Sequence, residues 1–216
     1  MTQSTTTTAK KIASQLLEIG AVHLRPDQPF TWTSGIKSPI YCDNRITMSH
    51  PAVRREIAQA FAQTIRERFP EAQVVAGTAT AGIPHAAWVA EILDLPMIYV
   101  RDKAKGHGRQ NQIEGRLEAG QKVVVIEDLI STGGSSLKAA QAVQAEGGEV
   151  LGVVAIFSYQ FPDAEALFTE AGVPMTTLSH YTALLEAAQE SGVITADQVQ
   201  FLSKWREQPK TFYNEM

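Results

Sequence analysis

The chain has 216 residues, of which 44% are hydrophobic and 19% are charged, and its formal net charge is -4. This length fits one globular domain with additions, and the composition excludes disordered and fibrous proteins. The acidic balance argues against a general cationic surface, so we expect no nucleic-acid partner.

The N-terminal part predicts a tail, a helix and an irregular segment. Polar residues 4–8 offer nothing to bury and predict a frayed tail. Apolar residues then recur at helical spacing as far as Gly20, which predicts a short amphipathic helix containing Ile12, Leu16 and Ile19. Residues 21–45 are rich in proline, threonine, serine and aromatic residues, which is typical of short strands and turns that cover something.

A long helix follows, and after it the pattern changes. Ser49 as a capping residue and Pro51 in the first turn predict a helix that continues to Phe69. Continuous apolar runs then occur at 74–76, 97–100, 123–126 and 150–157, with helical stretches at 85–93 and 137–145. Strands of this kind are covered on both faces, so we predict an α/β fold with a doubly wound, mostly parallel sheet. Ligands of such sheets bind at the carboxyl ends of the strands.

The C-terminal part and the cysteine content complete the outline. Helical patterns at 181–189 and 196–205 predict two further helices, to which we assign no chemistry. Cys42 is the only cysteine, which excludes an intrachain disulfide and fits a reducing compartment. No apolar leader and no run of about 18 apolar residues occurs, so we expect a cytoplasmic protein without a membrane segment.

Residues 123–136 form the most informative stretch, an apolar strand that ends in Glu127 and Asp128 and continues into small and hydroxylated residues. Glycine N–H groups, hydroxyls and a helix N-terminus together suit a phosphate monoester, while two acids can accept hydrogen bonds from a vicinal diol. No lysine follows the glycines, so this is not a Walker A loop, and the glycine spacing is not that of the dinucleotide fingerprint. In the alternative interpretation, Thr132 or Ser135 only caps the helix and the acids are solvated.

Two other loops follow predicted strands. Residues 78–82 are small and leave room for a polyanion against backbone N–H groups, although such residues also serve tight strand-helix packing. Residues 101–109 are basic at every odd position, so an extended chain would present a cationic row. A solvated charged face is the usual interpretation of such a run. Gly106 and Gly108 favour instead a mobile lid over a phosphate site.

Residues 123–136 resemble the 5-phosphoribosyl 1-pyrophosphate (PRPP) motif of the type I phosphoribosyltransferases. The order of hood, small-residue loop, basic lid and PRPP motif is similar to the orotate phosphoribosyltransferases over nearly the whole chain. The segment 30–45, with Ser34-Gly35, Ser38-Pro39 and Asp43-Asn44-Arg45, resembles their base-covering hood. Gln112-Ile113-Glu114-Gly115 closes the lid region as in many members.

The resemblance implies the type I phosphoribosyltransferase fold, with a small hood built from the N-terminal and possibly the C-terminal segments. It divides the chain into a tail, helix and hood at 1–50, an α/β PRPP-binding core at 51–160, and a helical extension at 161–216. This extension is expected to pack on the core or the hood.

The resemblance also implies roles for individual residues. In the PRPP motif, two acids hold the ribose hydroxyls and the following loop holds the 5-phosphate, through Glu127, Asp128, Leu129, Ile130, Ser131, Thr132, Gly133, Gly134 and Ser135. The pyrophosphate loop consists of Thr78, Ala79, Thr80, Ala81 and Gly82. The lid contacts the pyrophosphate through Arg101, Lys105 and His107, with Lys103 reaching in from the neighbouring subunit of a homodimer. The catalytic residues are then Lys103, Lys105, His107 and Asp128.

The sequence departs from the family at two positions that contact the substrates. Some family members have a lysine in place of Thr33 and an arginine in place of Tyr159, and those residues contact PRPP and the carboxylate. Orotate contacts are therefore expected from Ser131, Lys37 and Tyr41, although Lys37 is equally well interpreted as a solvated turn residue.

The implied reaction is transfer of the 5-phosphoribosyl group from PRPP to orotate, in pyrimidine (UMP) biosynthesis. Mg²⁺ is expected as the cofactor, because the departing pyrophosphate needs charge neutralisation, with no dedicated metal site in the protein. Two alternatives remain open: transfer to another base, such as a purine or uracil, and a regulator that senses PRPP and binds nucleic acid. The second would need a basic groove or DNA-binding module, and the chain shows neither.

Overall fold

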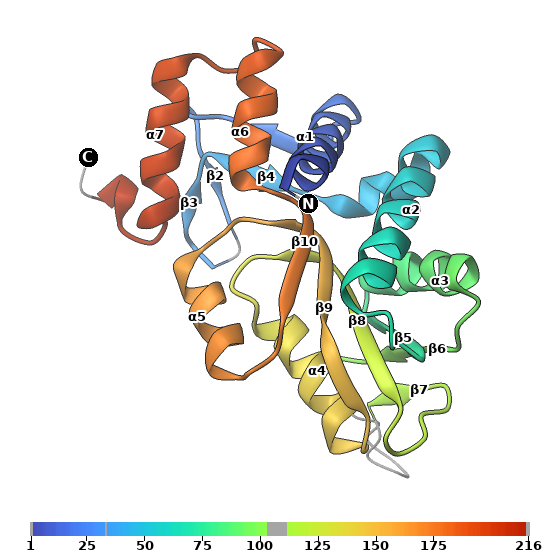
Figure 1. Cartoon of the computed structure of the whole chain (residues 1–216). Helices are drawn as coiled ribbons and strands as arrows, with labels where there is room; N and C mark the ends of the chain where they lie inside the picture. The colour runs from blue at the N-terminus through green and yellow to red at the C-terminus, as the bar shows by residue number, and fades with distance from the viewer. Residues whose placement is uncertain (1, 33, 103–111, 215–216) are drawn as a thin grey trace.

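A six-stranded sheet forms the centre of the computed structural model, which describes residues 2–32, 34–102 and 112–214 (Figure 1). The strands lie in the order β10-β9-β8-β5-β6-β7. They are β5 (Val74–Thr78), β6 (Met97–Val100), β7 (Ile113–Glu114), β8 (Lys122–Ile130), β9 (Glu149–Ser158) and β10 (Met175–His180). All neighbours pair in parallel except β6 and β7. The predicted doubly wound, mostly parallel sheet is confirmed.

Helices cover both faces of this sheet. On one side lie α1 (Thr2–Glu18), α2 (Pro51–Arg68) and α3 (Gly82–Leu93), and on the other lie α4 (Gly134–Ala145) and α5 (Pro162–Glu170) (Figure 1). Successive residues of β8 alternate between the two cores: Val124 belongs to the cluster with α1 to α3, and Val125 to the cluster with α4 and α5. Burial on both faces explains why these strands are continuous apolar runs.

The hood consists of two short hairpins and the last two helices. β1 (Val22–Leu24) pairs with β4 (Ile40–Cys42), and β2 (Phe30–Thr31) pairs with β3 (Lys37–Ser38), both antiparallel. A 3₁₀ helix, η1 (Asn44–Ser49), leads into α2. The C-terminal elements are α6 (Tyr181–Glu190), α7 (Ala196–Glu207) and η2 (Phe212–Asn214). Figure 1 shows α7 beside β2 and β3.

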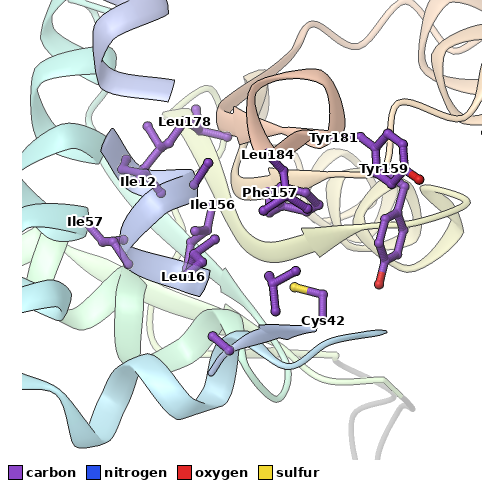
Figure 2. Close-up of a cluster of buried hydrophobic side chains, with 14 of the residues drawn as sticks. Ile12, Leu16, Cys42, Ile57, Ile156, Phe157, Tyr159, Leu178, Tyr181 and Leu184 are labelled. Carbon is purple, nitrogen blue, oxygen red and sulfur yellow. The ribbon is translucent and has the colours of Figure 1, made fainter. Parts of the chain in front are cut away.

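One buried cluster joins the hood to the sheet. Figure 2 shows side chains of α1, α2, β9, β10 and α6 meeting Cys42 of β4, and Tyr159 lies in the same cluster. Ile156, Phe157 and Tyr181 are completely or almost completely excluded from solvent. The hood is therefore packed on the core rather than tethered to it.

Three expectations are corrected. Residues 4–8 are not a frayed tail, because α1 begins at Thr2; burial of Ile12 and Leu16 anchors the helix, and extending a formed helix is inexpensive. Ser49 doesn't cap α2, since it ends η1 and His50 takes the capping position without a side-chain bond. The segment 161–216 is not purely helical, because it contains β10, which extends the sheet beside β9.

None of the helices within the described ranges is long and apolar enough to cross a membrane.

Candidate active site

The strand order creates a crevice between the carboxyl ends of β5 and β8. The chain leaves β5 for β6 on one side, whereas β8 pairs with the other side of β5, which is the topological switch point where open α/β sheets bind ligands. Gly82, at the start of α3, lies so close to β8 that an added Cβ would be 2.5 Å from the carbonyl oxygen of Ile126. Glycine at this position therefore lets the loops after β5 and β8 lie side by side.

Of the two acids at the end of β8, Glu127 is buried and Asp128 is half-buried. Glu127 is 5% exposed; its Oε1 accepts a hydrogen bond from the Asp128 N–H (3.0 Å) and its Oε2 accepts one from Ser136 Oγ (3.0 Å). Burial and the neighbouring charge of Asp128 raise the pKa of Glu127, and burial raises the pKa of Asp128. Such carboxylates gain from hydroxyl donors or a cation, as a ribose diol with a bound metal would supply.

The loop after β8 leaves the first turn of α4 open. Gly133 is the N-cap at φ 80°, and no described side chain caps the helix. The alternative in which Thr132 or Ser135 is only a cap is therefore wrong. An added Cβ on Gly133 would lie 2.9 Å from Phe168, whereas Gly134 faces open space. Free N–H groups, exposed hydroxyls and the helix dipole make this turn suitable for a phosphate group.

The loop after β5 lies beside the same helix. Thr78 is 3% exposed, and its Oγ1 finds no hydrogen-bond partner in the described part of the chain. The Ala79–Thr80 peptide is cis, and α3 starts after Ala81 without a side-chain cap. A cavity of about 590 Å³ is lined by Thr78 together with Arg101, Asp102, Gln112, Gly134, Ser135 and Lys138, among others. The structure thus brings the expected pyrophosphate loop, Arg101 and the phosphate loop to one cavity.

The predicted lid residues Lys103, Lys105 and His107 lie outside the described residues. The two ends of this segment are held together: Arg101 N–H donates to the Gln112 carbonyl (2.8 Å), and Gln112 Nε2 donates to the Arg101 carbonyl (3.2 Å). The Arg101 guanidinium also lies 3.5 Å from Glu114. Arg101 and Gln112, on either side of residues 103–111, therefore both line the 590 Å³ cavity.

A second cavity, of about 250 Å³, lies between the hood and the β8 loop. Its lining comes from β2, β4 and the ends of β8 and β9, and consists of Thr31, Trp32, Tyr41, Cys42, Leu129, Ser131 and Tyr159. Ser131 and Tyr41 were expected to contact the base and both lie here. Lys37 is not among these residues; its side chain is exposed, and its carbonyl accepts a hydrogen bond from Trp205 Nε1 (3.1 Å). Thr33 lies outside the described residues.

Aromatic side chains build one wall of this base cavity. The ring centroids of Trp32 and Tyr159 are 5.2 Å apart, and Tyr159 stacks on Phe161 at 5.4 Å. Trp32 Nε1 donates to the Ile40 carbonyl at 3.1 Å, which fixes the indole. Burial raises the pKa of the Tyr159 phenol well above its usual range, so this side chain stays neutral. The cavity suits a flat ring, and none of its lining residues carries a formal charge at neutral pH.

Several site residues escaped the sequence-based prediction. Ser136 lies within the predicted motif, but nothing in the sequence indicates that it binds Glu127. Lys138 lies three residues after Ser135, about one helical turn further on, and this spacing could have indicated that it faces the same cavity. Asn44 belongs to the quoted hood pattern, but its contact with β8 depends on tertiary packing.

These features define the class: the switch-point crevice, the open α4 N-terminus and the acid pair are those of a phosphoribosyltransferase, and residues 47–166 match the family described as "Phosphoribosyl transferase domain". The orotate phosphoribosyltransferase of Enterococcus faecalis is 60% identical to this chain over 207 residues, which cover 96% of this chain and 99% of that protein. The chain belongs to the orotate phosphoribosyltransferases, which are pentosyltransferases.

Solved structures are similar as well. The orotate phosphoribosyltransferase from Aeropyrum pernix is 28% identical with a TM-score of 0.73, covering 85% of this chain and 99% of that chain. The Mycobacterium tuberculosis enzyme, solved in complex with PRPP, is 26% identical with a TM-score of 0.63, covering 82% and 98%.

Proposed function

We propose that the chain transfers the 5-phosphoribosyl group of PRPP to orotate, giving orotidine 5'-monophosphate and pyrophosphate in UMP biosynthesis. The observation that carries the proposal is the adjacency of two different sites: an acid pair with an open helix N-terminus, and an uncharged cavity for a flat ring. Ser131 lines the ring cavity at the point where the phosphate loop begins. A base and a ribose phosphate bound there would lie next to each other.

In this proposal, the loop 131–135 binds the 5-phosphate and Glu127 with Asp128 binds the ribose hydroxyls. The loop 78–82 and the basic residues Arg101, Lys105 and His107 bind the pyrophosphate. The bond from ribose C1 to the pyrophosphate oxygen breaks with its electron pair on the oxygen, while an orotate ring nitrogen forms the new bond to C1. Positive charge beside the leaving group stabilises this transition state. The ring nitrogen of orotate is acidic, so no general base is needed.

Mg²⁺ is part of the proposal, and it would neutralise charge on the pyrophosphate. Mg²⁺ prefers oxygen ligands and usually keeps water and substrate phosphates beside one or two carboxylates. Glu127 and Asp128, adjacent at the end of β8, would supply carboxylate oxygens of this kind.

We also propose a cytoplasmic homodimer in which Lys103 enters the neighbouring active site. Mixing a Lys103→Ala subunit with an Asp128→Asn subunit should then restore part of the activity, because each mixed dimer keeps one intact site. Verified mixed dimers without recovery would contradict a shared lysine.

The decisive experiment measures pyrophosphate release from PRPP with orotate, uracil, hypoxanthine or adenine in turn, with Mg²⁺ or with excess chelator. Rapid release of pyrophosphate is expected only when both orotate and Mg²⁺ are present. Release with a purine or uracil instead would establish one of the alternative bases, and full activity in chelator would refute the metal requirement. The identity to enzymes over nearly the whole chain favours catalysis over a nucleic-acid-binding regulator.

A further inference from the structure

We propose that Asn44 is a positioning residue that holds the base cavity in register with the ribose-binding end of β8. Asn44 is the first residue of η1, two residues after the end of the hood strand β4, and it is completely buried. Its Nδ2 donates a hydrogen bond of 2.7 Å to the backbone carbonyl of Asp128. This inference rests on the proposed function, since it assigns Asp128 to the ribose.

The orientation of the Asn44 amide follows from its partners. The Asp128 carbonyl can only accept, so the amide nitrogen must face it and Oδ1 must face away. On that side the Cys42 thiol donates to Oδ1 at 3.3 Å. Cys42 lines the base cavity, so one amide group connects a wall of that cavity to the peptide of the ribose-binding acid.

The backbone of Asn44 is also held in place, by a contact within η1. Thr47 Oγ1 donates to the Asn44 carbonyl at 2.6 Å and lies 3.5 Å from Nε2 of His85, a buried residue of α3. The segment that carries Asn44 is therefore seated on the helix that begins at the pyrophosphate loop. A displacement of the hood relative to β8 would have to break these buried contacts.

The reaction gives this connection a function. The new bond joins an atom of the base, held by the hood, to C1 of the ribose, held at β8. A misplacement of about 1 Å between two reacting groups can reduce a rate by roughly 100-fold. Loss of the Asn44 amide should therefore reduce kcat while each substrate still binds to its own half of the site.

The test compares Asn44→Ala with Ser38→Ala, which removes two other buried hydrogen bonds within the hood: Ser38 Oγ donates to the Ile40 carbonyl (2.8 Å) and accepts from the Ile40 N–H (3.2 Å). We expect Asn44→Ala to reduce kcat about 30-fold or more, with KM for PRPP and for orotate changed by less than about threefold. Ser38→Ala should keep kcat within about threefold at a similar loss of thermal stability. PRPP affinity measured by calorimetry should be alike in both variants.

A second variant keeps the shape of the side chain. In Asn44→Asp the new carboxyl can donate to the Asp128 carbonyl only when it is protonated, so kcat relative to the unsubstituted chain should recover as pH falls from 8 to 6. This recovery distinguishes a hydrogen bond from simple packing, and it remains measurable if Asn44→Ala folds poorly.

Three outcomes would overturn the proposal: an unchanged kcat in Asn44→Ala, an equal loss in Ser38→Ala, or a loss that is entirely a rise in KM for PRPP. The last would place Asn44 in the ribose site alone. If the unsubstituted chain doesn't convert orotate, the proposed function fails instead, and that result is visible before any variant is made.

Discussion

The crevice between β5 and β8 and the base cavity under the hood are built in opposite ways. In the crevice, Glu127, Ser136 and the loop between them come from one strand-loop-helix unit, and removal from solvent raises the pKa values of both Glu127 and Asp128. In the base cavity, Thr31 and Tyr41 come from the hood, whereas Ser131 and Tyr159 come from the ends of β8 and β9, far away in the sequence. The crevice concentrates charge and backbone N–H groups, whereas the cavity offers neutral, mostly aromatic walls.

The difference reflects what each half recognises. A phosphate needs N–H groups and small residues, which a short contiguous motif can supply. A flat ring needs a slot of fixed width, which only packing between distant segments can set. Substitutions in the crevice should therefore affect catalysis with little effect on folding, while substitutions that support the cavity should affect folding and base affinity together.

The largest effect is expected from Asp128→Asn, which keeps the shape and removes the charge that the proposed function assigns to the ribose. Turnover should fall by roughly 100-fold or more, while thermal stability stays the same or rises, because burial raises the pKa of this carboxyl and so disfavours its charge. Steady-state kinetics and a melting curve measure both. Asp163→Asn, an exposed change in α5, is the control. Loss of several kcal/mol of folding stability would identify Asp128 as a structural residue.

Trp205→Phe tests the cavity half. Trp205 is completely buried, donates to the Lys37 carbonyl, and contacts Trp32 edge-on at 6.0 Å. Losing the indole N–H and part of its volume should reduce the unfolding free energy by about 2 kcal/mol. KM for orotate should rise several-fold while KM for PRPP remains unchanged. Trp88→Phe, a half-buried change on α3, is the matched control. Equal changes in both KM values would show that the two halves are not separable.

The same contrast explains how much of the molecule could be predicted from sequence. The core strands and the phosphate loop follow from contiguous patterns, in which apolar runs and a Gly-Gly turn lie side by side in the chain. Tyr159 was noticed only as a departure from the family, since its ring contact with Trp32 depends on a hood residue 127 positions earlier in the sequence. The β10 strand was missed because Thr176, Thr177 and Ser179 interrupt its apolar pattern at the sheet edge.

His85 of α3 lies beside Thr47 of η1, and it predicts acid sensitivity. Burial lowers its pKa to about 4, and within the described residues its Nδ1 has no hydrogen-bond partner. Between pH 6.5 and 4 the unfolded chain therefore binds more protons than the folded chain, so stability is full above pH 6.5 and declines as pH falls. At pH 5, His85 should lower the free energy of unfolding by about 2 kcal/mol relative to pH 8. Urea unfolding gives the difference in unfolding free energy between pH 8 and pH 5. In His85→Gln this difference should be smaller by about 2 kcal/mol. An unchanged difference would contradict the assignment to His85.

The smallest expected effect is a gain in stability in Glu127→Gln. The raised pKa of Glu127 means that the folded chain favours the protonated form, so its stability contribution is present below the ordinary carboxyl pKa and declines as pH rises above it. A glutamine keeps the acceptor for the Asp128 N–H and can donate to Ser136 Oγ, and it carries no charge. At pH 8 the ligand-free variant should be more stable by about 1 kcal/mol, or roughly 2–4 °C in Tm. Glu91→Gln, an exposed change on α3, controls for the altered net charge. Calorimetry at pH 5 and pH 8 measures the gain in Tm, which should be larger at pH 8. A variant with a lower Tm than the unsubstituted chain at both pH values would mean that the Glu127 carboxylate stabilises the crevice.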